Sequence, residues 1–263
     1  MSIRSPLPLL LSALLLLAAI ARADDRWAPN AVAGPVDQLD VSGNACGPAA
    51  LLAAIRCGDG KWRAVAEKIP GRSDRSKLLY IIKAHGVRPS ASLRGRNRWS
   101  RHGINAEDLA DVAGELAGIG GLPAPRIENL LPGRRESVPN TLKRLHRRFR
   151  QSLINGLPPV ISLRRYVLRH GAWVTLDSHF VTLVQVPEKL AGGEKQFTLT
   201  YFDPWGGKKR TATLREPVVP VLSPDGQRSG ALEFFAPDAD VGRDKARSGE
   251  RTLLVPAIAI GRW

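Results

Sequence analysis

The spacing of the apolar residues changes once along this chain, near Pro158, and this change constrains the fold more than any other feature. Before it, apolar residues recur at helical spacing, and we expect helices at about 46–57, 61–69, 75–85, 106–117 and 141–154. After it, short apolar or alternating runs predict strands at 160–163, 179–186, 196–202, 210–214, 232–235 and 253–260. Helices followed by strands, without regular alternation, predict an α+β fold.

The N-terminus has the features of a secretory signal peptide. Arg4 precedes an apolar stretch at residues 7–20, and residues 21–23 (ARA) form a small-x-small cleavage site. We therefore expect residues 1–23 to be removed and residues 24–263 to form one exported domain without a transmembrane segment, in the bacterial periplasm or outside the cell. The alternative is an uncleaved membrane anchor.

The chain is strongly basic. It has 39 Lys and Arg against 24 Asp and Glu, a formal charge of +15, and the excess is concentrated in residues 72–102 and 134–150. Within the first block, cations surround an aromatic ring in Arg94, Arg96, Arg98, Trp99 and Arg101. Such a surface can bind phosphate or carboxylate groups. For an exported chain this favours an anionic cell-envelope polymer or an acidic substrate over nucleic acid, and a merely solubilising loop is the alternative.

The two cysteines exclude a disulfide-rich scaffold, and no CxxC or Cys/His cluster suggests a structural zinc. Cys46 and Cys57 are 11 residues apart in one expected helix, about 16 Å along its axis, beyond the reach of about 7 Å that a disulfide allows. We expect two free thiols and no metal or organic cofactor. Cys57 should be a small buried residue. Cys46 begins the helix, where the dipole lowers the pKa of a thiol, and is the candidate nucleophile.

A thiol nucleophile needs a base and a group that orients the base. Among the five histidines, His179 begins an expected strand. A symmetric antiparallel hairpin centred on Ala191 would place it opposite Asp203, with Cβ atoms about 5 Å apart. His179 is therefore the candidate base and Asp203 its orienting group, with an ordinary His–Asp pair at the rim of the sheet as the alternative. The other histidines are expected at the surface or in caps: His85, His102, His146 and His170.

Four short motifs occur in order: residues 44–51 (NACGPAAL), 155–161 (NGLPPVI), 179–184 (HFVTLV) and 201–206 (YFDPWG). Together they resemble the bacteriocin-processing-like group of papain-fold cysteine peptidases, which are related to double-glycine leader peptidases. The resemblance implies a papain-like fold, in which an N-terminal helical half carries the nucleophile and a C-terminal antiparallel sheet carries His and Asp. It assigns Cys46 as nucleophile, His179 as general base and acid, and Asp203 as orienter. It also implies that Gln38 forms an oxyanion hole with the Cys46 N–H.

The resemblance covers residues 36–57 and 140–207, which is under half of the chain. Residues from about 60 to 138, which include the first basic block, are longer than the family's usual connection and form an unmatched insertion. Gln38 stands eight residues before Cys46, farther than in the closest members. The chain has no transporter segment, so cleavage after a double glycine is not carried over.

These features predict an exported cysteine peptidase that hydrolyses a peptide bond through a Cys46 acyl-thioester. One alternative is a transamidase or amidase that acts on cell-wall peptides through the same thioester. Another is a non-catalytic, cationic envelope-binding protein on a papain-like scaffold, in which the Arg/Trp loop binds the polymer.

Overall fold

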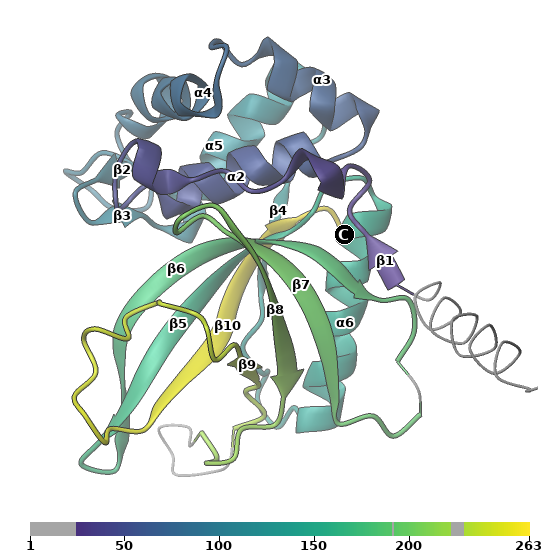
Figure 1. Cartoon of the computed structure of the whole chain (residues 1–263), viewed down its shortest axis with the longest axis vertical. Helices are drawn as coiled ribbons and strands as arrows, with labels where there is room; N and C mark the ends of the chain where they lie inside the picture. Colours follow the sequence, from purple (N-terminus) through teal and green to yellow (C-terminus); the bar gives the residue numbers. More distant parts are fainter. Residues whose placement is uncertain (1–24, 191, 222–228) are drawn as a thin grey trace, which may run out of the picture.

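The chain combines a large antiparallel sheet with a layer of helices packed over one end of it (Figure 1). The structure, a computed structural model, describes residues 25–190, 192–221 and 229–263. The expected α+β class is confirmed. The predicted signal peptide, residues 1–23, lies outside the described residues. Among the helices that the structure does describe, none is long and apolar enough to cross a membrane.

All five expected helices form. They are α2 (Cys46–Cys57), α3 (Gly60–Lys68), α4 (Asp74–Ile81), α5 (Ala106–Ile119) and α6 (Val138–Ile154), with short 3-10 turns at Ala31–Ala33 and Gln38–Asp40. Local caps fix several starts: the Asn105 side chain accepts a hydrogen bond from the Asp108 N–H, as the sequence predicts for α5. The expected helix at 75–85 is α-helical only to Ile81 and ends in a π turn, Ile82–Gly86.

All six expected strands form, five of them longer than their apolar runs. The main sheet contains β1 (Asp25–Trp27), β4 (Arg126–Asn129), β5 (Val160–Arg169), β6 (Ala172–Pro187), β7 (Gln196–Asp203), β8 (Lys208–Arg215), β9 (Glu233–Phe235) and β10 (Thr252–Gly261). Its order is β4-β10-β5-β6-β7-β8-β9, with β1 paired to β6, and all pairs are antiparallel. A small hairpin, β2 (Trp99–Ser100) and β3 (Gly103–Ile104), lies outside this sheet.

The predicted register of the β6–β7 hairpin is wrong by two residues. The structure pairs Thr182 with Phe202 and Leu183 with Tyr201, and a bulge between Leu183 and Gln185 adds one residue to β6. Ala191, the expected centre of the turn, lies outside the described residues. The shift is two on the side of the bulge that holds His179 and Asp203, and three where Gln185 pairs with Thr200; a shift of two keeps side chains on their original face, because side chains alternate with a period of two. His179 and Asp203 therefore still share a face, diagonally rather than directly opposite.

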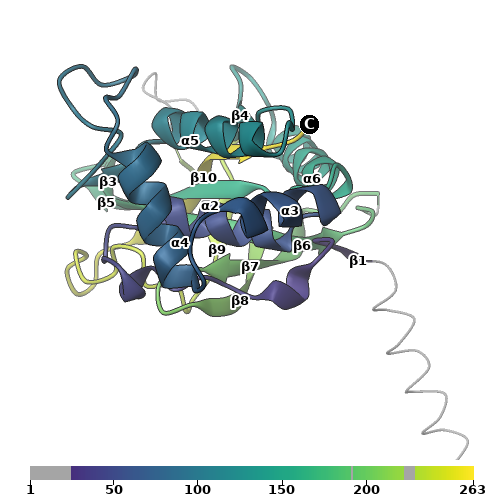
Figure 2. The same ribbon diagram turned by 90° about the horizontal axis from the view of Figure 1, so that it is seen from above.

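Two apolar clusters stabilise the layers. One lies between α6 and the sheet, and the other surrounds α2, ten of whose residues are buried. The expected insertion at 60–138 supplies α3, α4 and α5, which pack around α2 as seen from above in Figure 2. Trp62, Leu78 and Leu109 from this segment are almost completely buried against α2 and its neighbours. The segment is thus an integral layer of the fold, and it holds α2 firmly over the sheet.

Candidate functional site

Cys46 is the first residue of α2, and its half-buried side chain lies where the helix meets the sheet. The next residue has no room for a side chain: a Cβ on Gly47 would come within 2.4 Å of the Ile104 Cγ2 atom. Glycine therefore allows the helix start to pack closely against β3. The residue before the helix, Ala45, offers no side-chain cap, so the first N–H groups of α2 keep their capacity to bind an anion or a thiolate.

His179 lies on β6 beside Cys46. The strand and the helix are joined by a buried hydrogen bond in which the Thr182 hydroxyl donates to the Ala50 carbonyl at 2.7 Å. Thr182 is three residues after His179, and Ala50 is four residues after Cys46, so this bond fixes the position of the strand against the helix. His179 is 8% exposed and lines the same cleft as Cys46, close enough for each side chain to shift the pKa of the other.

Asp203 ends β7 and completes a line of three side chains. Its Oδ1 accepts a hydrogen bond from His179 Nε2 at 2.8 Å and another from the Trp205 N–H at 2.9 Å. Its Oδ2 forms an ion pair with Arg210 Nε at 3.0 Å, and the carboxylate is 1% exposed. Because Nε2 faces Asp203, the other ring nitrogen, Nδ1, is left for Cys46.

The electrostatics of this line favour a thiolate beside an imidazolium. Burial raises the pKa of Cys46, but the His179 hydrogen bond and charge, with the N–H groups of Phe180 and Gly47, outweigh it and bring this pKa below its ordinary value. Burial lowers the pKa of His179, and the hydrogen bonds and charges of Asp203 and Cys46 reverse that effect and raise it to about 10. Burial likewise raises the pKa of Asp203, yet His179 and Arg210 hold it below its usual value.

Gln38 is completely buried in the 3-10 turn that precedes α2. Its backbone N–H donates to the Pro204 carbonyl at 2.9 Å, which attaches this turn to the one that follows Asp203. Its side-chain Nε2 donates to the Gly43 carbonyl at 2.5 Å. Gln38 is therefore next to the segment that leads into Cys46, but it does not line the cleft described below, and its part in an oxyanion hole stays a prediction.

Cys46, His179 and Asp203 line a cleft of about 930 Å³. The helical wall consists of Gly43, Asn44 and Cys46 with the β2–β3 turn, Arg101, His102 and Gly103. The sheet contributes Asp177, Ser178, His179, Asp203 and Trp205. The far wall is a segment of the β9–β10 loop, Asp240, Val241, Gly242, Arg243, Asp244 and Lys245. This loop is drawn in yellow in Figure 1, and nothing in its sequence pointed to the cleft.

Two arginines hold the far wall in place. Arg165, buried on β5, donates to the carbonyls of Ala239 and Val241. Arg210, on β8, donates to the Asp238 carbonyl and pairs with the Asp240 carboxylate at 3.0 Å, while it also pairs with Asp203. Arg210 thus connects the far wall directly to the carboxylate behind His179. Neither arginine could be singled out from the sequence, because alternate charged residues on a strand are typical of a solvated face.

The first basic block does not act as one surface. Arg98 is half-buried and pairs with Glu115 at 2.8 Å and with Asp111 at 3.7 Å. The indole N–H of Trp99 donates to the Asn44 carbonyl at 3.2 Å. These two residues attach the β2–β3 hairpin to the body of the protein. The other arginines between residues 94 and 101, Arg94, Arg96 and Arg101, are exposed, and Arg101 lines the cleft.

The other cysteine and histidines lie away from this line. Both cysteines are free, as predicted, and burial raises the pKa of Cys57 to about 12. His102 and His170 are exposed as expected. The positions predicted for His85 and His146, at the surface or in caps, are wrong: both are buried, His85 against Glu115 at 2.6 Å and His146 against the Pro187 carbonyl at 2.7 Å. Each histidine is buried with a single polar partner that is distant in sequence, and a sequence pattern does not reveal such a partner.

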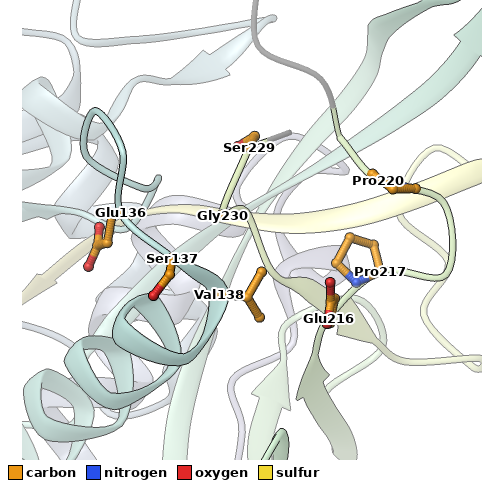
Figure 3. Close-up of a pocket in the computed structure, with 8 residues that line it drawn as sticks. All are labelled: Glu136, Ser137, Val138, Glu216, Pro217, Pro220, Ser229 and Gly230. Atoms are coloured by element: carbon orange, nitrogen blue, oxygen red, sulfur yellow. The ribbon is translucent and has the colours of Figure 1, made fainter. Parts of the chain in front are cut away.

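A second, smaller hollow of about 160 Å³ lies between the start of α6 and the chain after β8 (Figure 3). Of its two acids, Glu136 is already paired with Arg144 at 2.9 Å, and Glu216 is exposed. Within the residues that the structure describes, no group of three or more His, Cys, Asp or Glu side chains could hold a metal ion. Comparison of the chain with protein-family models, curated proteins and solved structures finds no match. The site therefore has to be interpreted from its own geometry.

Proposed function

We propose that this protein is a cysteine hydrolase that cleaves a peptide bond, with a papain-like arrangement of its reacting groups. The observation that carries the proposal is that Cys46, His179 and Asp203 line one cleft, with His179 hydrogen bonded to Asp203 at 2.8 Å. A helix that begins with the cysteine and packs on an antiparallel sheet with the histidine and the aspartate agrees with the resemblance of the four motifs. Export of the protein rests on the signal peptide predicted at residues 1–23.

In the proposed reaction, the Cys46 thiolate attacks the carbonyl carbon of the substrate and a C–S bond forms. The oxyanion is held by the N–H of Cys46 at the start of α2, and the part of the buried Gln38 amide stays a prediction of the resemblance. The imidazolium of His179 then gives its proton to the leaving amine, the C–N bond breaks, and an acyl-thioester remains. His179 next takes a proton from water, which attacks the thioester and releases the carboxylic acid and the thiol. Asp203 keeps the ring oriented in both steps.

The test uses both cysteines of the chain. Cys46→Ala should abolish cleavage of a diverse peptide mixture, while Cys57→Ala, a matched change in a buried thiol outside the cleft, should retain it. Mass spectrometry of the products gives the cleaved bond, and an added amine separates hydrolysis from acyl transfer, because both use the same thioester. Cleavage that survives Cys46→Ala would refute the proposal.

A further inference from the structure

The acidic side chains of the cleft are largely neutralised within the fold. Asp177 pairs with Lys245 at 2.9 Å, and Asp203 pairs with His179 and Arg210. Asp240 also pairs with Arg210, at 3.0 Å. Among the described residues that line the cleft, Asp244 is the remaining acid, and its side chain is exposed. Most of the negative charge in the cleft is therefore already balanced by nearby cations.

Two basic side chains of the cleft are in the opposite situation. Arg101 is exposed, and its Nε donates to His102 Nε2 at 3.2 Å. Arg243 is exposed, and one of its Nη2 hydrogens goes to the Pro237 carbonyl. In the part of the chain that the structure describes, neither arginine forms an ion pair with an aspartate or glutamate. Because a guanidinium has five N–H donors, each keeps most of them for another partner.

The two arginines come from opposite walls, and each wall is anchored. Arg101 is in the β2–β3 turn, where the Asn44 side chain donates to the Ser100 carbonyl at 3.1 Å beside Cys46. Arg243 is in the β9–β10 loop, which Arg165 holds through backbone carbonyls. Guanidinium groups in such positions suit a carboxylate, because their planar forks can donate two parallel hydrogen bonds to it.

We propose that the cleft selects substrates with a carboxylate close to the scissile bond, such as an acidic peptide, and that Arg101 and Arg243 bind this carboxylate. The inference rests on the proposed function, since it names the substrate class of the same cleft. The two arginines without an ion pair outnumber the one such acid, Asp244, and this excess has the same sign as the charge of the whole chain, +15, so a negatively charged substrate is attracted both on approach and on docking.

Two small reagents test this without knowledge of the natural substrate. Iodoacetamide and iodoacetate alkylate a thiolate by the same step, in which the sulfur displaces iodide to form an S–C bond, but only iodoacetate is negatively charged, so a change in the ratio of the two rates reports the charge of the cleft. Arg101→Gln and Arg243→Gln should each slow the reaction of Cys46 with iodoacetate about threefold, and together about tenfold, as expected for one unit charge at close range in a solvated cleft. The rate with neutral iodoacetamide should stay within about twofold, which also shows that the variants are folded.

Arg94→Gln is the matched control, because Arg94 is an exposed arginine of the same block that does not line the cleft. It should leave both rates unchanged, and high salt should reduce the preference of the wild type for iodoacetate. A pair of peptides that differ only by Glu or Gln beside the cleaved bond should show the same dependence on the two arginines in kcat/KM. An unchanged ratio of the two rates in the double variant, with normal iodoacetamide reactivity, overturns this inference alone. If Cys46 reacts with neither reagent, the proposed function fails as well.

Discussion

Replacing His179 with asparagine removes the cation that keeps Cys46 ionised, and the size of the effect follows from the surroundings of the sulfur. A thiol with the ordinary pKa of 9.0 is only about 0.1% ionised at pH 6, so a complete thiolate–imidazolium pair raises the thiolate fraction by up to about 1,000-fold. A less basic thiolate is also a weaker nucleophile, with a Brønsted coefficient of about 0.4–0.5, which removes part of this gain. Wild-type Cys46 should therefore react with iodoacetamide at pH 6 about 10–100 times faster than an unperturbed thiol.

In His179→Asn the burial of Cys46 remains while its cation is lost, so the pKa of the thiol should rise above 9.0 and the reaction at pH 6 should fall by at least the same factor. The assay is the alkylation rate as a function of pH, with the labelled cysteine identified by peptide mapping. Because the pKa of His179 is raised, the ion pair should persist through neutral pH and be lost as the pH rises through about 10. The pair should also be lost at low pH, because the Cys46 thiolate becomes protonated once the pH falls below the lowered pKa of this thiol.

Cys57 is the internal control of this experiment. Burial raises its pKa to about 12, so it should not react in the folded protein at any pH of the assay and should react after unfolding in denaturant. Two results would contradict the reasoning. One is a wild-type rate that rises about tenfold per pH unit between 6 and 8, which is the behaviour of an ordinary thiol. The other is a profile that His179→Asn does not change.

Three further substitutions test the scaffold of the site. Thr182→Val removes the hydrogen bond between β6 and α2, so it should lower the free energy of unfolding by about 1 kcal/mol, lower Tm by about 2–4 °C and slow the alkylation of Cys46. The control is Thr200→Val, which also loses a buried hydrogen bond and should lower Tm without changing the alkylation rate. Gly114→Ala in α5, whose new methyl group meets Ala124 at an ordinary 3.4 Å, should stabilise the protein by about 0.5–1 kcal/mol, so a lower Tm would contradict it. Arg210→Met leaves one Asp203 oxygen without its cation and should lower kcat about tenfold, partly restored in Arg210→Lys; equal activity of all three proteins would exclude a positioning role.

The helices could be predicted from sequence because their signals are local. The bounds of α2 agree to the residue, and Asn105 caps α5 as its position suggested. The strands β1 and β4 were missed for the opposite reason. They have three and four residues, mostly half-buried or exposed, and they become strands because β6 and β10 offer hydrogen-bonding edges that are distant in sequence. A short stretch without apolar alternation does not predict a strand, because its pairing depends on partners that are distant in sequence.

The proximity of His179 and Asp203 was predicted correctly from a register that is wrong. A bulge near Leu183 and an asymmetric turn shift the pairing by two residues, and neither is visible in a pattern of apolar alternation. The contact survives because an even shift leaves both side chains on one face, and because a His–Asp hydrogen bond spans the diagonal at 2.8 Å. An odd shift would have separated them by the thickness of the sheet.

The far wall of the cleft could not be predicted at all. Residues 240–245 are polar apart from Val241 and Gly242, as in an ordinary solvated loop. Their position depends on Arg165 and Arg210, which lie 76 and 30 residues away from the loop atoms that they hold. Side-chain bonds over such distances follow from the complete fold and leave no local pattern.

The proposed chemistry and the proposed selectivity of this site depend on different parts of the chain. Cys46, His179 and Asp203 all lie inside the four motifs, whereas Arg101 and Arg243 lie in the segments that the motifs do not cover. The resemblance can thus suggest a reaction while it leaves the substrate open, because Arg101 and Arg243 lie outside the four motifs that carry it. Replacement of the two arginines by glutamine should accordingly change which peptides are cleaved and leave the reactivity of Cys46 toward neutral reagents intact. Replacement of His179 should reduce both peptide cleavage and the reactivity of Cys46.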